Sequence, residues 1–112
     1  MRIIGYEDKR IGELAFVYIR LHAGIDRIEL QSKRRARNLV EGRTLFTWIL
    51  RNHTGARPAS YPAIGELLGD LDPSSIRYLD AKADILRERD PAFVALCTGF
   101  AHFERERRGD PV

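Results

Sequence analysis

A short helix, a glycine turn and the start of a second helix are encoded in Ile64-Gly65-Glu66-Leu67-Leu68-Gly69-Asp70-Leu71-Asp72-Pro73-Ser74-Ser75-Ile76. Gly69 follows the first apolar segment, as is typical of a helix end. Asp72 and Pro73 fit an N-cap and a first helical position, because aspartate accepts an orphan amide hydrogen bond and proline has no amide to lose. The stretch therefore predicts a helix-turn-helix with a turn of about four residues.

Helical spacing continues on both sides of this turn, with apolar residues at intervals of three and four. It predicts a first helix ending near Gly24, a short helix over 25–30, a long central helix over 38–53 that stops near Gly55, helices over 62–68 and 73–89, and a last helix from Asp90-Pro91, which repeats the cap signal. No alternating strand pattern interrupts it. The expected fold class is an all-α bundle of five or six helices.

The sequence also predicts which residues form the core. Ala15 to Ile19 are consecutive apolar residues that cannot share one helix face, so we expect them to cover the core, with a homodimer contact through this N-terminal helix as the alternative. The apolar faces comprise Ile11, Leu14, Ala15, Tyr18 and Leu21 in the first helix, Ile25, Ile28 and Leu30 in the second, Leu39, Leu45, Phe46, Ile49 and Leu50 in the third, and Phe93, Val94, Leu96, Cys97, Phe100 and Phe103 in the last.

The charge distribution is more informative than the net charge of +3. Residues 33–57 carry seven basic and one acidic residue, whereas residues 1–32 carry five of each and residues 58–112 carry seven basic and ten acidic. A local positive block of this density attracts a polyanion. Its densest part, Ser32 to Arg37, is called the basic loop below.

Catalysis and metal binding have little support in the sequence. The chain lacks the Gly-x-x-x-x-Gly-Lys-Ser/Thr loop of an ATP-hydrolysing protein. His22, His53, His102 and the single Cys97 have no metal-ligand spacing, so we expect no cofactor and no metal. The lone cysteine and the lack of a signal peptide or a long apolar run predict a cytoplasmic protein rather than a secreted or membrane one.

A helix pair with a glycine turn is common in helical proteins and does not by itself identify DNA binding. In a DNA-binding pair, the first turn of the second helix presents free backbone amides to phosphate, and short side chains such as Ser74 and Ser75 allow close approach to the major groove. Both expectations apply to the helix that begins at Pro73.

The chain resembles the C-terminal DNA-binding domain of the bacterial replication initiator DnaA, a Trp-repressor-like helix-turn-helix. Residues 32–43 are similar to the basic loop and next helix start of that family. Tyr61-Pro62-Ala63-Ile64-Gly65 resembles its Leu-Pro-x-Ile-Gly, and residues 68–76 resemble its Phe-Gly-Gly-Arg-Asp-His-Thr-Thr-Val signature. The resemblance covers roughly residues 19–97. We expect N-terminal helices over 1–31 that pack on or extend the domain, a DnaA-like DNA-binding domain over 32–108 and a tail over 109–112.

The resemblance also implies roles for individual residues. Arg35 matches the arginine that enters the minor groove, and Lys33, Arg43 and Arg51 match positions at the DNA backbone. Asp72 and Ser74 match base-contacting positions, and Ser75 matches a hydroxyl at a phosphate. The full set of expected DNA-binding residues is Lys33, Arg34, Arg35, Arg37, Arg43, Arg51, Asp72, Ser74, Ser75 and Arg77.

Two positions depart from the family signature. Leu71 stands where the family has the arginine that reads guanine, and Pro73 stands where it has a histidine. Neither side chain can make a bidentate bond to guanine. We therefore expect a small bacterial regulator of transcription or replication that binds double-stranded DNA with altered specificity. The alternative is a protein-interaction module that kept the fold and lost DNA binding.

Overall fold

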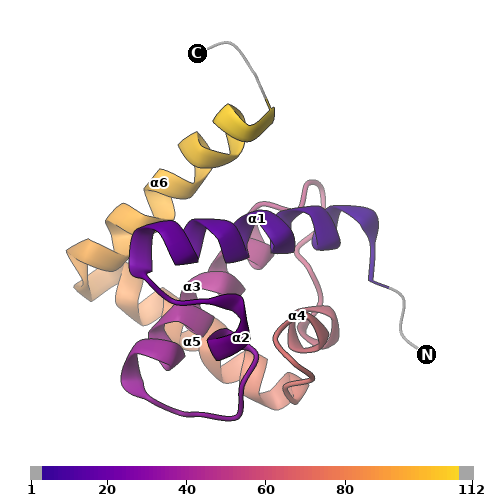
Figure 1. Cartoon of the computed structure of the whole chain (residues 1–112), viewed down its shortest axis with the longest axis vertical. Coiled ribbons are helices and arrows are strands. Elements are labelled where there is room, and N and C mark those ends of the chain that lie inside the picture. Colours follow the sequence, from indigo (N-terminus) through magenta and orange to yellow (C-terminus); the bar gives the residue numbers. More distant parts are fainter. Residues whose placement is uncertain (1–3, 109–112) are drawn as a thin grey trace.

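The computed structural model describes residues 4–108 and arranges them as six helices around one core (Figure 1). Within that range there is no strand, which confirms the all-α prediction. The predicted tail over 109–112 lies outside the described residues. The helices are α1 (Tyr6–Ala23), α2 (Arg27–Leu30), α3 (Arg37–Asn52), α4 (Tyr61–Leu67), α5 (Pro73–Arg89) and α6 (Pro91–Arg108).

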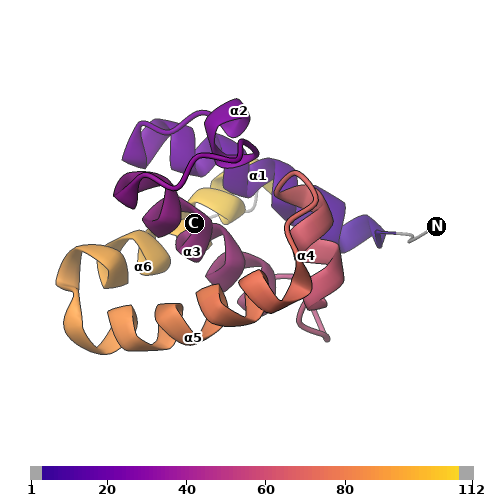
Figure 2. The same cartoon turned by 90° about the horizontal axis from the view of Figure 1, so that it is seen from below.

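Helix α3 is the centre of the bundle and contacts α1, α2, α5 and α6 (Figure 2). Its side chains Leu39, Phe46, Ile49 and Leu50 have no exposed surface. The predicted stop at Gly55 is wrong, because the helix ends at Asn52. The Thr54 hydroxyl lies within hydrogen-bonding distance of the carbonyls of Leu50 and Arg57, at 3.2 and 2.6 Å, and so ties the following loop back onto the helix end.

The consecutive apolar residues of α1 are accommodated because this helix has partners on two sides. The Phe16 ring lies 4.6 Å from the ring of Phe46 in α3. The Tyr18 hydroxyl donates to the carbonyl of Leu96 in α6 at 2.6 Å. Of the run from 15 to 19, four residues are buried and one is partly buried. Packing within the chain therefore uses this run, which confirms the expectation that it covers the core.

Two residues expected in the core lie at the surface. Ile28 is 82% exposed and Leu21 is 55% exposed. Helix α2 has only one turn. Leu30 in this helix and Ile25, which precedes the helix, both pack against Gly42 of α3. Ile28 is therefore left facing solvent. Leu21 lies in the last turn of α1, beyond the buried positions of that helix. No helix within residues 4–108 is both long enough and apolar enough to cross a lipid bilayer.

Helices α4 and α5 form the predicted helix-turn-helix. Gly69 and Asp70 both adopt positive φ, +82° and +65°, a conformation that glycine and aspartate tolerate better than most residues. The amide of Leu71 donates to the carbonyl of Gly65 at 2.9 Å, and a side chain on Gly65 would collide with the Leu71 carbonyl. The Asp72 carboxylate accepts from the amide of Ser74 at 2.8 Å, so the predicted N-cap is confirmed.

The second predicted cap is also confirmed. Asp90 accepts from the amides of Ala92 and Phe93 at 3.0 and 3.3 Å, and Pro91 is the first residue of α6. Because α5 and α6 share this tight junction, the end of α5 is fixed against the bundle. Its beginning is fixed by the turn after α4.

Candidate nucleic-acid interface

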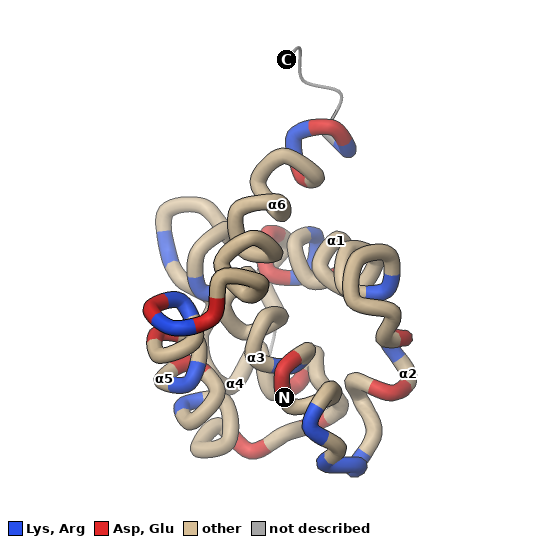
Figure 3. The backbone as a smooth tube through the Cα atoms, turned by 90° about the vertical axis from the view of Figure 1, so that its left-hand side faces the viewer, with Lys and Arg blue, Asp and Glu red and all other residues tan. Residues whose placement is uncertain are grey.

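The basic loop links α2 to α3 and lies at the same edge of the molecule as the start of α5, the lower edge in Figures 1 and 3. Lys33, Arg34 and Arg35 are exposed, and so is Arg37, the first residue of α3. Arg34 and Arg37 have nearby carboxylates, Glu29 at 3.7 Å and Glu41 at 3.4 Å. Lys33 and Arg35 form no ion pair with the described residues.

The backbone of the basic loop is held by Arg43, which the family resemblance placed at the DNA backbone. Only 5% of Arg43 is exposed. Its guanidinium donates to four carbonyls, those of Leu30, Arg34, Glu29 and Ser32, at 2.8, 2.7, 3.3 and 2.8 Å. Burial, and secondarily the charge of Arg35, lowers the pKa of Arg43, although arginine remains protonated in proteins. The contacts of Arg43 favour a role in shaping the loop over a direct phosphate contact.

A hollow of about 350 Å³ lies between the basic loop and α5. Its exposed rim includes Arg35, Ser74, Ser75 and Tyr78, and its less exposed lining includes Val40, Leu71 and Leu79, with Arg43 beside them. The predicted minor-groove residue Arg35 and the predicted major-groove residues Ser74 and Ser75 therefore border one depression. None of the described side chains that line it is acidic.

The backbone amides at the start of α5 are already bonded, which corrects the expectation that they are free. Pro73 has no amide, the amide of Ser74 donates to the Asp72 carboxylate, and the amide of Ser75 donates to the Asp72 carbonyl at 2.9 Å. The Ser74 hydroxyl also donates to that carboxylate, at 2.8 Å. The two hydrogen bonds from Ser74 lower the pKa of Asp72, so this carboxyl is ionised at neutral pH. Side chains, rather than free amides, remain available for an anion here.

Arg51 is likewise used within the fold. Its guanidinium donates to the carbonyl of Ala59 at 2.9 Å and lies 3.5 Å from the Asp80 carboxylate. It also lies over the Tyr61 ring, and the Tyr61 hydroxyl donates to Asp80 at 2.7 Å. This last hydrogen bond raises the pKa of Tyr61. Arg77 lies over the same ring, 5.5 Å from its centroid, but is exposed.

Tyr78 is a surface residue at the hollow that the sequence reasoning missed. Its side chain is 62% exposed and it lines the hollow together with Ser74 and Ser75. The spacing of three and four residues from these serines places it on the same helix face. That spacing was visible in the sequence and could have identified it.

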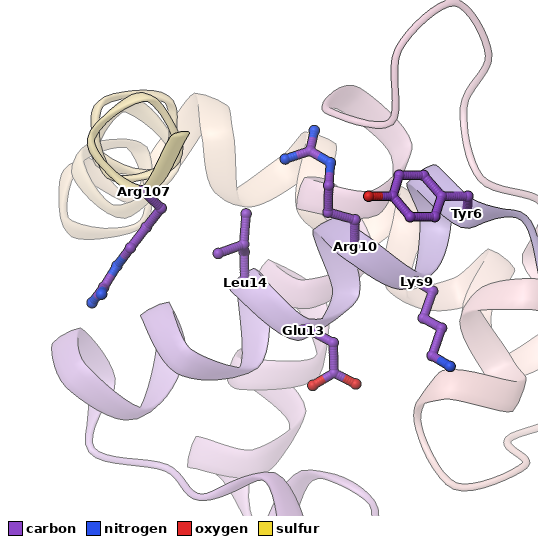
Figure 4. A pocket seen from close by; sticks show the side chains of 6 residues that line it. All are labelled: Tyr6, Lys9, Arg10, Glu13, Leu14 and Arg107. Carbon is purple, nitrogen blue, oxygen red and sulfur yellow. The ribbon is translucent and has the colours of Figure 1, made fainter. Parts of the chain in front are cut away.

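A second hollow lies between α1 and α6 (Figure 4). Tyr6, Lys9, Arg10, Glu13, Leu14 and Arg107 line it. Arg10 is bonded to Glu7 at 2.8 Å and approaches Glu104 at 3.4 Å, so its charge is compensated locally. This hollow contains none of the candidate DNA-binding residues.

Comparison with known proteins gives a family match over residues 18–82, to the model described as the bacterial DnaA protein helix-turn-helix. The chain belongs to the bacterial DnaA helix-turn-helix family. The matched range contains every candidate residue, from Lys33 to Arg77. Membership in the DnaA helix-turn-helix family indicates a domain that binds DNA rather than one that catalyses a reaction.

One curated relative is the chromosomal replication initiator protein DnaA of Pelobacter propionicus, which is 34% identical over 68 residues. The aligned part is 61% of this chain and 14% of that protein, so the chain spans a small fraction of its relative's length. No solved structure matches the chain. The DnaA family match begins inside α1 and ends inside α5, and it leaves out all of α6.

Proposed function

We propose that this domain binds double-stranded DNA as a small bacterial regulator of transcription or replication, with the basic loop in a minor groove and the start of α5 in the adjacent major groove. The observation that supports it best is the hollow that Arg35 borders together with Ser74 and Ser75. Two neighbouring grooves of one duplex could be contacted from such an arrangement without any rearrangement of the fold.

The residues that contact phosphate in this proposal are fewer than the sequence suggests. Arg43 and Arg51 are committed to carbonyls and Asp80, which leaves Lys33, Arg34, Arg35, Arg37 and Arg77 as the exposed cations among the candidate residues. Arg34 and Arg37 have carboxylate neighbours that reduce their contribution. Neutralising about four phosphates would give a slope of about −4 in a plot of log affinity against log salt concentration.

The sequence preference in this proposal differs from that of initiators with the full signature. The Ser74 hydroxyl donates its proton to Asp72, so its oxygen is left as an acceptor. An acceptor at this place suits the amino group of adenine or cytosine, whereas Leu71 and Pro73 offer no donor to guanine.

A selection from random duplex DNA, followed by titration at several salt concentrations, tests the proposal. Enrichment of a defined sequence and the steep salt dependence would support it. The protein-interaction alternative predicts no enriched sequence and a flat salt response, with a partner recovered after nuclease treatment. That result would overturn the proposal.

A further inference from the structure

We infer that the α5 side of the hollow reads the C5-methyl group of a thymine in the major groove, and that Leu71 and Tyr78 are the residues that do so. The inference rests on the proposed function and names what distinguishes the preferred DNA sequence. It concerns a position where the family signature has an arginine and this chain has an apolar side chain.

Apolar side chains form part of the lining of the hollow. Val40, Leu71 and Leu79 give it an apolar lining of limited exposure, and the exposed Tyr78 ring adds apolar surface at the rim. In unmodified DNA the thymine methyl is the one apolar group displayed on a base edge in the major groove. The apolar side chains on the α5 side of the hollow therefore match the thymine methyl among the groups displayed on base edges.

The surroundings of the hollow make nucleic acid a better occupant than an apolar protein side chain. Arg35 and Arg43 border it, and no acidic side chain among its described lining residues opposes a phosphate backbone. Ser74 and Ser75 are small, so a base edge can approach close to α5 beside Leu71. A positively charged rim with an apolar lining fits a methyl group carried on a polyanion.

The position of Leu71 is fixed by the backbone. Its amide is bonded to the Gly65 carbonyl at 2.9 Å, and it directly precedes the N-cap Asp72. Ile76, one turn into α5, is fully buried and anchors the same segment. The backbone of Leu71 is therefore ordered before DNA binds and loses little freedom on binding.

The decisive experiment changes the DNA and leaves the protein intact. In the duplex selected by the wild-type chain, each thymine in turn is replaced by deoxyuridine, which removes only the methyl group. We expect one or two replacements to weaken binding about fourfold, the effect of one buried methyl group. Leu71→Ala and Tyr78→Ala should reduce that loss to less than about twofold, and Ile85→Ala, an exposed apolar residue further along α5, should leave it unchanged.

The outcomes separate this inference from the proposed function. If a duplex is selected but no deoxyuridine replacement alters its affinity, or if both variants keep the full sensitivity, the inference is overturned and DNA binding stands. If no duplex is selected, both are overturned. Tyr78 is largely exposed, so its variant keeps the test decisive even where Leu71→Ala lowers stability.

Discussion

Gly69 packs against the backbone of Gln31, with no room for a side chain between them. A Cβ atom on Gly69 would collide with the Gln31 carbonyl oxygen, and the Gln31 side-chain amide donates to the carbonyl of Leu67 at 2.8 Å. Gln31 directly precedes the basic loop, and Gly69 lies in the turn between α4 and α5. This contact holds the two parts of the candidate interface in a fixed relation.

Gly69→Ala should therefore lower the free energy of unfolding by about 3 kcal/mol, because the collision is with backbone and the φ of +82° is also unfavourable for alanine. Gly24→Ala is the matched control. Gly24 has a similar φ of +71°, but no atom lies within 4 Å of its added Cβ, so its cost should be about 1 kcal/mol. Chemical denaturation of both variants measures the difference, and equal losses would contradict the contact.

Arg43 holds the backbone of the basic loop through hydrogen bonds to four carbonyls. Arg43→Ala should lower the free energy of unfolding by about 3 kcal/mol, because it removes the charged hydrogen bonds of a buried guanidinium to four carbonyls between Glu29 and Arg34. Arg43→Lys should recover little of it, since an ammonium cannot reach four carbonyls in that fork geometry. Denaturation curves measure both.

The control for Arg43 is Arg37→Ala, which removes a cation of the same loop whose side chain is 93% exposed. Its unfolding free energy should change by no more than about 0.5 kcal/mol. If Arg43 acted only as a phosphate contact, Arg43→Ala and Arg37→Ala would both be as stable as the wild type. They would differ from the wild type only in their affinity for DNA.

The contrast between Arg35 and Arg43 illustrates what could not be predicted from the sequence. Both are arginines of one cationic block, and only the folded path of the loop around α3 decides that one is exposed and the other is enclosed by carbonyls. Arg51 is similar, because its partner Asp80 comes from a distant helix. Ile28 was misplaced since a one-turn helix has too short a pattern to fix its buried side.

Local signals, in contrast, were sufficient for the helix boundaries near the interface. The Asp-Pro pairs at 72–73 and 90–91 mark the starts of α5 and α6, because a cap depends only on neighbouring backbone amides. Gly69 marks the turn for the same reason. The interface itself needed tertiary structure, since the hollow combines residues more than thirty positions apart.

The Asp72 cap should make stability depend on pH. Its hydrogen bonds hold the folded-state pKa below the ordinary value of 3.8, so its stabilisation is present above that value and is lost as the pH falls through the folded-state pKa. Asp72→Ala should have a lower melting temperature than the wild type at pH 7. The difference in melting temperature should become smaller as the pH falls below 4. Asp26→Ala is the control, because Asp26 precedes α2 without a side-chain cap bond. A gap that is independent of pH would contradict the role of the ionised carboxylate.

The last prediction concerns Arg35, whose charge meets no carboxylate partner within the described residues and borders the hollow. Arg35→Ala should reduce the slope of log affinity against log salt concentration by about one unit. It should also lower the affinity for A·T-rich duplexes more than Ser75→Ala does, because a narrow minor groove concentrates negative potential around an inserted arginine. Arg57→Ala removes an exposed cation from the loop between α3 and α4, outside the hollow, and should leave both quantities unchanged. Titrations of an A·T-rich and a G·C-rich duplex at several salt concentrations measure them. If Arg35→Ala and Arg57→Ala had equal effects, general electrostatic attraction would explain the binding, and a specific minor-groove role for Arg35 would be wrong.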